Sequence, residues 1–179
     1  LIESTGGGNI SVKGRAGIGG TSTAGVAVDP GAIVRTNTGS ITITGTGGTN
    51  SGGQNNGVQV HDGSIVESTG GGTIAITGNA GSQGMGIRVL FSGKVRTNGT
   101  GDITLTGVGG ATTGPINYGV GIDMNTSGVS PAVTNSGSGT ITINGTRGAN
   151  TSGGALAPGF YTANGGSGTV RIGYDGTNA

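Results

Sequence analysis

The chain has no cysteine and no tryptophan, and aromatic residues make up only 3% of it. Without cysteine it has neither a disulfide framework nor a thiolate metal site. Charged residues are also few, at 8%, and the formal net charge is +1. No cluster of basic residues occurs, so nothing indicates binding to nucleic acid. No apolar run approaches the roughly 20 residues of a membrane-spanning helix.

Glycine, by contrast, is abundant. It accounts for 46 of the 179 residues, where average usage is about 7%. By itself this composition is typical of low-complexity or disordered chains. Here, however, the large apolar residues are mainly Ile and Val, they recur periodically, and charge is scarce. The periodicity therefore predicts an ordered repeat protein.

Three short segments of alternating apolar and polar residues repeat in a fixed order. Copies of the first segment start at Ile2, Val34, Val66, Val95 and Val133. Copies of the second, often Ile-Thr-Ile-Thr-Gly, start at Ile10, Ile41, Ile74, Ile103, Ile141 and Val170. Copies of the third start at Val26, Val58, Ile87 and Val120, with a degraded copy at 154–157. Clusters of Gly, Asn, Ser and Thr separate the segments, as expected of turns between strands.

A unit of three short strands cannot bury its apolar face alone, so it must stack on the next unit. Similar strands recur a whole unit apart, which favours parallel, in-register pairing. We therefore expect an all-β, right-handed parallel β-helix (a β-solenoid) with three strands per coil and roughly five to six coils of about 29–38 residues. It should be a single domain, with repeats at approximately 2–33, 34–65, 66–94, 95–132 and 133–160, and a partial one at 161–179. Because the chain starts inside a unit, we expect it to be a segment of a longer protein.

Strand alternation should place the Ile, Val and Leu residues of the second segment inside and its Thr residues outside. One inward column would hold Ile10, Ile41, Ile74, Ile103 and Ile141. The next would hold Val12, Ile43, Ile76, Leu105 and Ile143. Unit length varies mainly in the loop between the second and third segments, at 46–56, 79–85, 108–118 and 146–153. The turn at 123–132 is a separate expansion.

Charged residues of alternating sign occupy one outward column of the first segment. The column reads Glu3, Arg35, Glu67, Arg96 and Thr134. Neighbouring coils are close enough for these side chains to touch, so they should form a ladder of opposite charges. Exposed pairs of this kind contribute a few tenths of a kcal/mol each and specify strand register. The ladder therefore predicts a structural role.

Threonine dominates two outward columns of the second segment. The candidate surface array is Thr42, Thr44, Thr77, Thr104, Thr106 and Thr142. A Thr-x-Thr array on a solenoid face resembles the ice-binding face of β-helical antifreeze proteins. Lys13, Ala75 and Asn144 interrupt it, however, and Thr is common at exposed strand positions in any case. Ice binding is therefore an alternative function.

Acidic residues follow the third segment in three coils, at Asp29, Asp62 and Asp123, with the single histidine, His61, beside Asp62. Stacked aspartates on a β-helix resemble the sites of pectate-lyase-like enzymes, where carboxylates bind Ca²⁺ or act as acid and base. Asp-Pro-Gly and Asp-Gly are also ordinary turn sequences, and no aromatic platform for a sugar is nearby. Polysaccharide binding or degradation is thus a second alternative. Neither a metal site nor a cofactor is predicted.

The Gly-Ser/Thr-Ile-Thr-Ile-Thr-Gly pattern is complete at 39–45, and the copies at 72–78 and 139–145 each depart from it once, at Ala75 and Asn144. With the Gly-Val-x-Val that follows, this pattern resembles the glycine-rich β-helix repeats of filamentous-haemagglutinin-like adhesins and autotransporter passengers. The resemblance implies export, display at a bacterial cell surface or secretion, and a structural or adhesive role. It supplies no catalytic residues.

The leading hypothesis is thus a non-enzymatic, extracellular solenoid segment of a bacterial protein. Its expected partners are further copies of itself or neighbouring solenoid domains, which would pair with exposed coil ends. A host or matrix surface is a further expected partner. Head-to-tail assembly into filaments follows from this hypothesis.

Overall fold

The computed structural model describes residues 1–19, 23–49, 53–112, 116–124, 132–149, 160–164 and 171–174, and within these ranges it contains strands and no helix. The first sheet consists of β1 (Ile2–Ser4), β4 (Ile33–Thr36), β7 (Ile65–Ser68), β10 (Lys94–Thr97), β13 (Ala132–Asn135) and β16 (Arg171–Tyr174). The second consists of β2 (Ile10–Arg15), β5 (Ile41–Thr46), β8 (Ile74–Asn79), β11 (Ile103–Val108) and β14 (Ile141–Thr146). The third consists of β3 (Val26–Val28), β6 (Val58–His61), β9 (Ile87–Leu90), β12 (Val120–Met124) and β15 (Phe160–Asn164).

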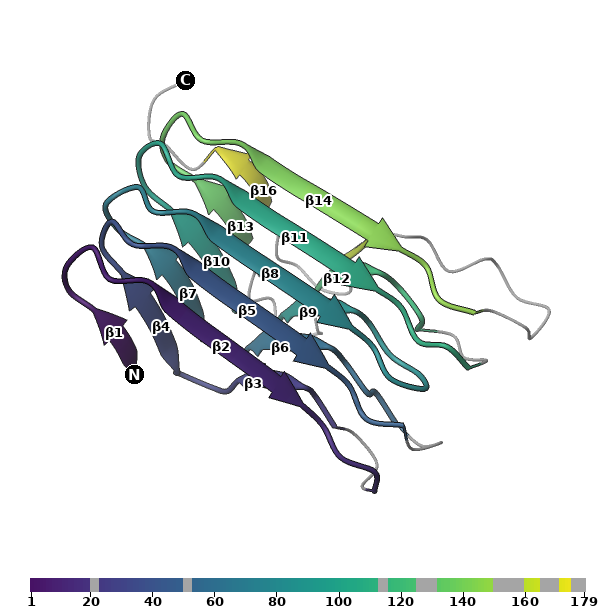
Figure 1. Ribbon diagram of the computed structural model, residues 1–179. Helices are drawn as coiled ribbons and strands as arrows, with labels where there is room; N and C mark the ends of the chain where they lie inside the picture. The colour runs from purple at the N-terminus through teal and green to yellow at the C-terminus, as the bar shows by residue number, and fades with distance from the viewer. Residues whose placement is uncertain are drawn as a thin grey trace.

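The protein is a parallel β-solenoid, as the repeat predicts. Every strand pairs in parallel with the equivalent strand of the next coil, and Figure 1 shows the three sheets stacked along one axis. Ile41, for example, is the register partner of Ile10 on one side and of Ile74 on the other. The stack amounts to about four turns, slightly fewer than the five to six predicted.

The C-terminal coils differ from the prediction in strand assignment. The segment that starts at Val170 was expected in the second sheet, but β16 pairs with β13 in the first, with Ile172 opposite Val133. That expectation is wrong because an alternating Val-Arg-Ile pattern fits either sheet. The third-sheet strand that follows β14 is β15, which pairs with β12. The degraded copy expected at 154–157 lies outside the described residues.

The core consists of the two predicted inward columns together with the inward residues of the other two sheets. Its central members are fully buried: Ile41, Ile43, Ile74, Ile76, Ile103 and Leu105 are at most 1% exposed. The columns are less covered at the two ends, where Val12, Ile141 and Ile143 are only partly buried. Burying an Ile or Leu side chain stabilises a fold by about 1.5–3 kcal/mol, so the middle coils carry most of the hydrophobic stabilisation.

The second and third sheets converge at a corner that only glycine fits. Gly78 occupies the fifth position of β8, and a Cβ placed on it would lie 2.0 Å from the carbonyl oxygen of Gly86. The same distance separates a Cβ on Gly45 from the carbonyl oxygen of Gly57. Real Cβ contacts are never this short. The repeated glycine at the end of Ile-x-Ile-x-Gly therefore sets how closely two sheets approach.

A second corner is closed by buried polar side chains. Thr36, Ser68, Thr97 and Asn135 are register partners in successive coils of the first sheet, and all are at most 2% exposed. The Thr97 hydroxyl donates to the carbonyl oxygen of Gly72 at 3.3 Å, and the Asn135 amide donates to that of Gly101 at 3.0 Å. These bonds satisfy turn carbonyls that would otherwise be buried without a partner.

Among the described residues, no helix is long and apolar enough to cross a membrane.

Candidate functional site

The charge ladder of the first sheet lies where the sequence placed it. Glu3 is the register partner of Arg35, Arg35 of Glu67, and Glu67 of Arg96. Arg35 Nη1 lies 3.6 Å from a Glu3 oxygen, and its Nε donates to Glu67 Oε1. Arg96 Nη2 lies 2.7 Å from Glu67 Oε2. The column ends at Thr134, the partner of Arg96.

Glu67 is more deeply embedded than the sequence predicted. Its side chain is only 4% exposed, while those of Arg35 and Arg96 are 36% and 40% exposed and cover it from both sides. Burial by itself would raise the pKa of the Glu67 carboxyl. Hydrogen bonds from Arg35 and Arg96 outweigh that cost and hold the pKa of Glu67 below its ordinary value. The ladder is therefore a neutralised ionic cluster that carries no reactive group.

The second sheet presents a flat outer face made largely of threonine. Thr44, Thr77 and Thr106 are register partners in three successive coils. Thr104 and Thr142 are partners in the neighbouring column, where Ala75 separates Thr104 from Thr42. The structure therefore brings the six predicted threonines together on one face, and all of them are exposed or half-buried.

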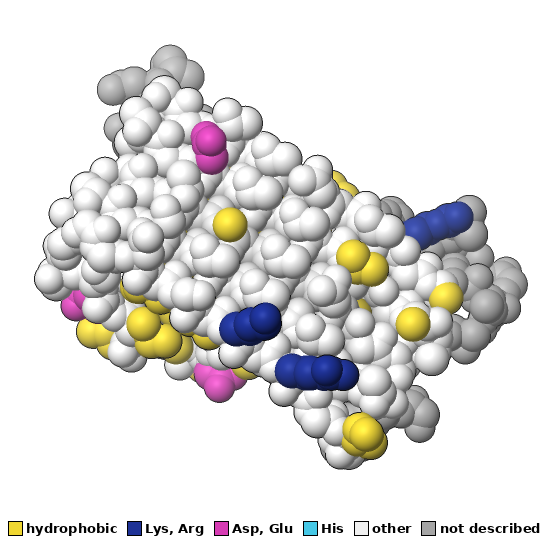
Figure 2. Space-filling model, in the orientation of Figure 1, with side chains coloured by type: hydrophobic (Ala, Val, Ile, Leu, Met, Phe, Trp, Pro, Cys, Tyr) yellow, Lys and Arg dark blue, Asp and Glu magenta, His cyan; other side chains and the backbone are white. Residues whose placement is uncertain are grey.

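Charged side chains lie at the margins of this threonine face. Figure 2 shows few hydrophobic or charged side chains over its middle strands. Lys13 and Arg15, both exposed, lie on β2 at one end. Asp102, just before β11, accepts a hydrogen bond from the backbone N–H of Thr140 at 2.7 Å. The face thus offers an array of hydroxyl groups with little net charge.

A shallow groove of about 620 Å³ runs beside the threonine face, along the loops that follow the second-sheet strands. Small residues of four coils line it, among them Ala16, Gly47, Ala80 and Ala111. Ile18, which is 90% exposed, borders the groove at the N-terminal coil. Arg15 is the one charged residue among those that line it. The groove therefore offers a shape but few groups that could recognise a ligand.

The structure brings two of the three predicted aspartates, Asp29 and Asp62, to His61. His61 lies between two of them: its Nε2 is 3.5 Å from Asp29 Oδ1, and its Nδ1 is 3.2 Å from Asp62 Oδ2. Asp123 is in register with Leu90, which is in register with His61, so Asp123 lies two coils away. That separation is roughly 10 Å at the usual strand spacing. The backbone of Asp123 therefore lies apart from the cluster that His61 forms with Asp29 and Asp62.

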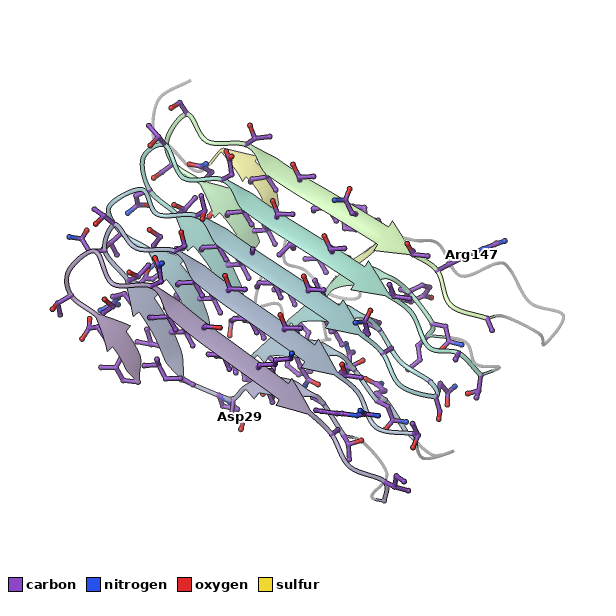
Figure 3. All side chains as sticks on the ribbon, in the orientation of Figure 1. Asp29 and Arg147 are labelled. Carbon is purple, nitrogen blue, oxygen red and sulfur yellow. The ribbon has the colours of Figure 1, made fainter. Side chains whose placement is uncertain are left out.

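No metal centre accompanies this cluster. In the part of the chain that the structure describes, no group of three or more His, Cys, Asp or Glu side chains is placed to hold a metal ion. Asp62 has a φ of 49°, so it serves the corner turn after β6 together with Gly63, whose φ is 75°. Asp29 and His61 do line a polar hollow of about 450 Å³ on the outer face of the third sheet. Figure 3 labels Asp29 at the lower edge of the rod, on the N-terminal coil.

Sequence reasoning missed the buried polar residues, among them Asn117. Its amide nitrogen donates to the carbonyl oxygen of Ala149 at 2.7 Å, and its Oδ1 accepts from the backbone N–H of Gly84 at 3.0 Å. The side chain thereby links its own loop to the loops of the coils on either side. Its signal in the sequence is the position: Asn117 and Asn55 both stand two residues before a Gly-Val pair.

Comparison with protein-family models, with curated proteins and with solved structures finds no match to this chain. The likeness to filamentous-haemagglutinin-like adhesins and autotransporter passengers therefore stays a prediction from the repeat motif.

Proposed function

We propose that this chain is a non-enzymatic structural and adhesive segment of a bacterial surface or secreted protein. The observation that carries the proposal is the unbroken parallel register of all three sheets. It turns a short repeat into a rod whose three strand faces recur from coil to coil, which is what a display scaffold needs. Asp29 and Asp62 meet at His61, whereas the backbone of Asp123 lies two coils from His61.

The rod has an open edge suited to end-to-end contact. Among the described strands, β1, β2 and β3 each pair on one side only. Ile2 and Leu1 beside them are 48% and 79% exposed. Unpaired strand edges of this kind accept another strand. A further coil, from another copy or from more of the same polypeptide, would pair with this edge and cover both residues.

Negative-stain electron microscopy and light scattering of the purified chain test this proposal. We expect filaments of constant width, and a scattering mass that rises with protein concentration. An isolated monomer at every concentration would refute end-to-end assembly for this segment.

A single edge variant sharpens the experiment. The backbone N–H of Ile10 donates to the carbonyl oxygen of Ser40 in the next coil. Because successive N–H groups along a strand point to opposite sides, the N–H of Ser11 points to the open edge. Ser11→Pro removes this donor without touching the ladder between β2 and β5, and it should shorten or abolish filaments. Ser11→Ala keeps the N–H and should assemble like the parent chain.

Ice binding is the second candidate, favoured by the stacking of Thr44, Thr77 and Thr106 on a flat face. It predicts thermal hysteresis that a bulky side chain on this face, as in Thr106→Tyr, reduces strongly. Ala27→Tyr, on the outer face of the third sheet, is the matched control and should leave the hysteresis unchanged. An unmodified chain without hysteresis or ice shaping would remove this candidate.

A further inference from the structure

The hollow on the outer face of the third sheet arises from one short side chain. Ala27 on β3 is the register partner of Gln59 on β6, which in turn is the partner of Arg88 on β9. The first coil thus carries a methyl group where the next two carry long polar side chains. The longer Gln59 side chain therefore forms one side of a hollow over Ala27, and Asp29 and His61 line one end of it.

The walls of this hollow present both hydrogen-bond donors and acceptors. Gln59 Oε1 accepts from the Asn56 amide at 3.0 Å, which leaves the NH₂ group of Gln59 as a donor. The Asp29 side chain is 73% exposed, and its contact with His61 Nε2 at 3.5 Å uses one oxygen. Gln54 completes the wall, with its Oε1 accepting from Arg88. A donor and an acceptor thus face the same space.

We propose that this hollow binds a neutral sugar unit of a glycan. A sugar hydroxyl both donates and accepts, so neighbouring hydroxyls can donate to the Asp29 carboxylate and accept from the Gln59 amide. Acidic sugars are disfavoured because Asp29 and the nearby Asp62 would repel them. A bound cation would need more ligands than this cluster supplies, since it does not form a metal-holding group.

The lining contains no Phe, Tyr or Trp ring on which a sugar could stack. A single site should therefore bind weakly, with a Kd of about 1 mM for a monosaccharide. The proposal goes beyond the scaffold role and does not depend on it, because the hollow can bind sugar whether or not rods assemble. If they do assemble, many copies along a filament would raise the avidity for a glycan surface.

The experiment measures binding of glucose, galactose and mannose to the full chain by saturation-transfer NMR and calorimetry, with galacturonate as the acidic comparison. Ala27→Gln fills the hollow with the residue that the next coil already carries at this register position, so the fold should accept it. We expect Ala27→Gln to weaken binding at least about tenfold. Ser11→Gln, on the outer face of the second sheet in the same coil, is the matched control and should bind like the parent chain. Asp29→Asn removes the charge of an exposed acceptor and should weaken neutral-sugar binding while reducing discrimination against galacturonate.

Circular dichroism and microscopy of the same preparations keep the outcomes distinct. Binding lost in Ala27→Gln but retained in Ser11→Gln, with unchanged spectra and assembly, supports the site. The site is overturned if no neutral sugar binds the parent chain at tens of millimolar, or if Ala27→Gln binds as well as the parent. Equal binding of galacturonate and galactose would overturn the assignment to neutral sugars. None of these results changes whether filaments form, so the scaffold proposal is judged separately.

Discussion

The carboxylate of Glu67 on β7 accepts a hydrogen bond from Nε of Arg96 on β10 at 2.7 Å. Arg35, in the coil on the other side, donates to the second oxygen of the same carboxylate. One buried negative charge is thus held between two partly exposed positive charges in three successive coils. An anion buried in this way is stable only while both partners remain.

Replacing Glu67 should therefore destabilise the rod. Glu67→Gln keeps the shape but removes the charge that Arg35 and Arg96 share, and the free energy of unfolding should fall by about 2 kcal/mol. Urea denaturation followed by circular dichroism measures this. Glu3→Gln is the control, because the Glu3 side chain is 32% exposed and its contact with Arg35 is longer, at 3.6 Å. A loss from Glu3→Gln as large as that from Glu67→Gln would contradict the distinction between buried and exposed rungs.

The same carboxyl should make stability depend on pH. Burial raises the pKa of Glu67, but the hydrogen bonds from Arg35 and Arg96 lower it by more than burial raises it. The folded-state pKa therefore lies below the unfolded value of about 4.3. The group therefore stabilises the fold fully above that unfolded value, and the contribution is lost as pH falls through the folded pKa. The stability difference between the parent chain and Glu67→Gln should be constant near neutral pH and shrink below about pH 4.3. If the stability difference stayed constant into strong acid, the negative charge of Glu67 would not be what stabilises the fold.

Much of this ladder could be read from the sequence, because register in a parallel solenoid follows from repeat spacing alone. The partners of Glu67 and the inward columns of Ile41 and Ile43 came from alignment of the copies. The depth of Glu67 did not, because it depends on how two arginine side chains fold over their neighbour. Spacing fixes which residues are adjacent, and side-chain packing fixes how far each is covered.

The hollow and the last coils were unpredictable for different reasons. The hollow exists because Ala27 is shorter than Gln59, a difference that matters only once the two are known to be neighbours. The assignment of β16 failed because Val-Arg-Ile carries no mark of its sheet. In the better copies that mark is the glycine at the end of the second segment, such as Gly78, whose meaning is steric.

Substitution of that glycine should be far more damaging than its small size suggests. In Gly78→Ala the new methyl group would lie 2.0 Å from the carbonyl oxygen of Gly86, so two sheets must separate. We expect a loss of about 3 kcal/mol or more, at the upper end of overpacking effects. Thermal unfolding followed by circular dichroism measures the loss.

Gly17→Ala is the matched control for this prediction. A Cβ on Gly17 meets nothing within 4 Å. The substitution should therefore change stability by less than about 0.5 kcal/mol, or raise it slightly by restricting the unfolded chain. If Gly78→Ala were tolerated as well as Gly17→Ala, the close approach of the second and third sheets would not be a requirement of the fold.

Asn117 should act as a staple between the loops of three coils. Asn117→Ala leaves the backbone N–H of Gly84 and the carbonyl of Ala149 without the side chain that pairs them. Because Asn117 is fully buried, water cannot replace it freely, and the loss should be about 2–3 kcal/mol. Asn144→Ala, at an exposed position on the threonine face, is the control and should be nearly neutral. Hydrogen exchange adds a local readout: the Gly84 amide should lose protection in Asn117→Ala and keep it in Asn144→Ala. An unchanged Gly84 amide would mean that backbone pairing alone holds these loops together.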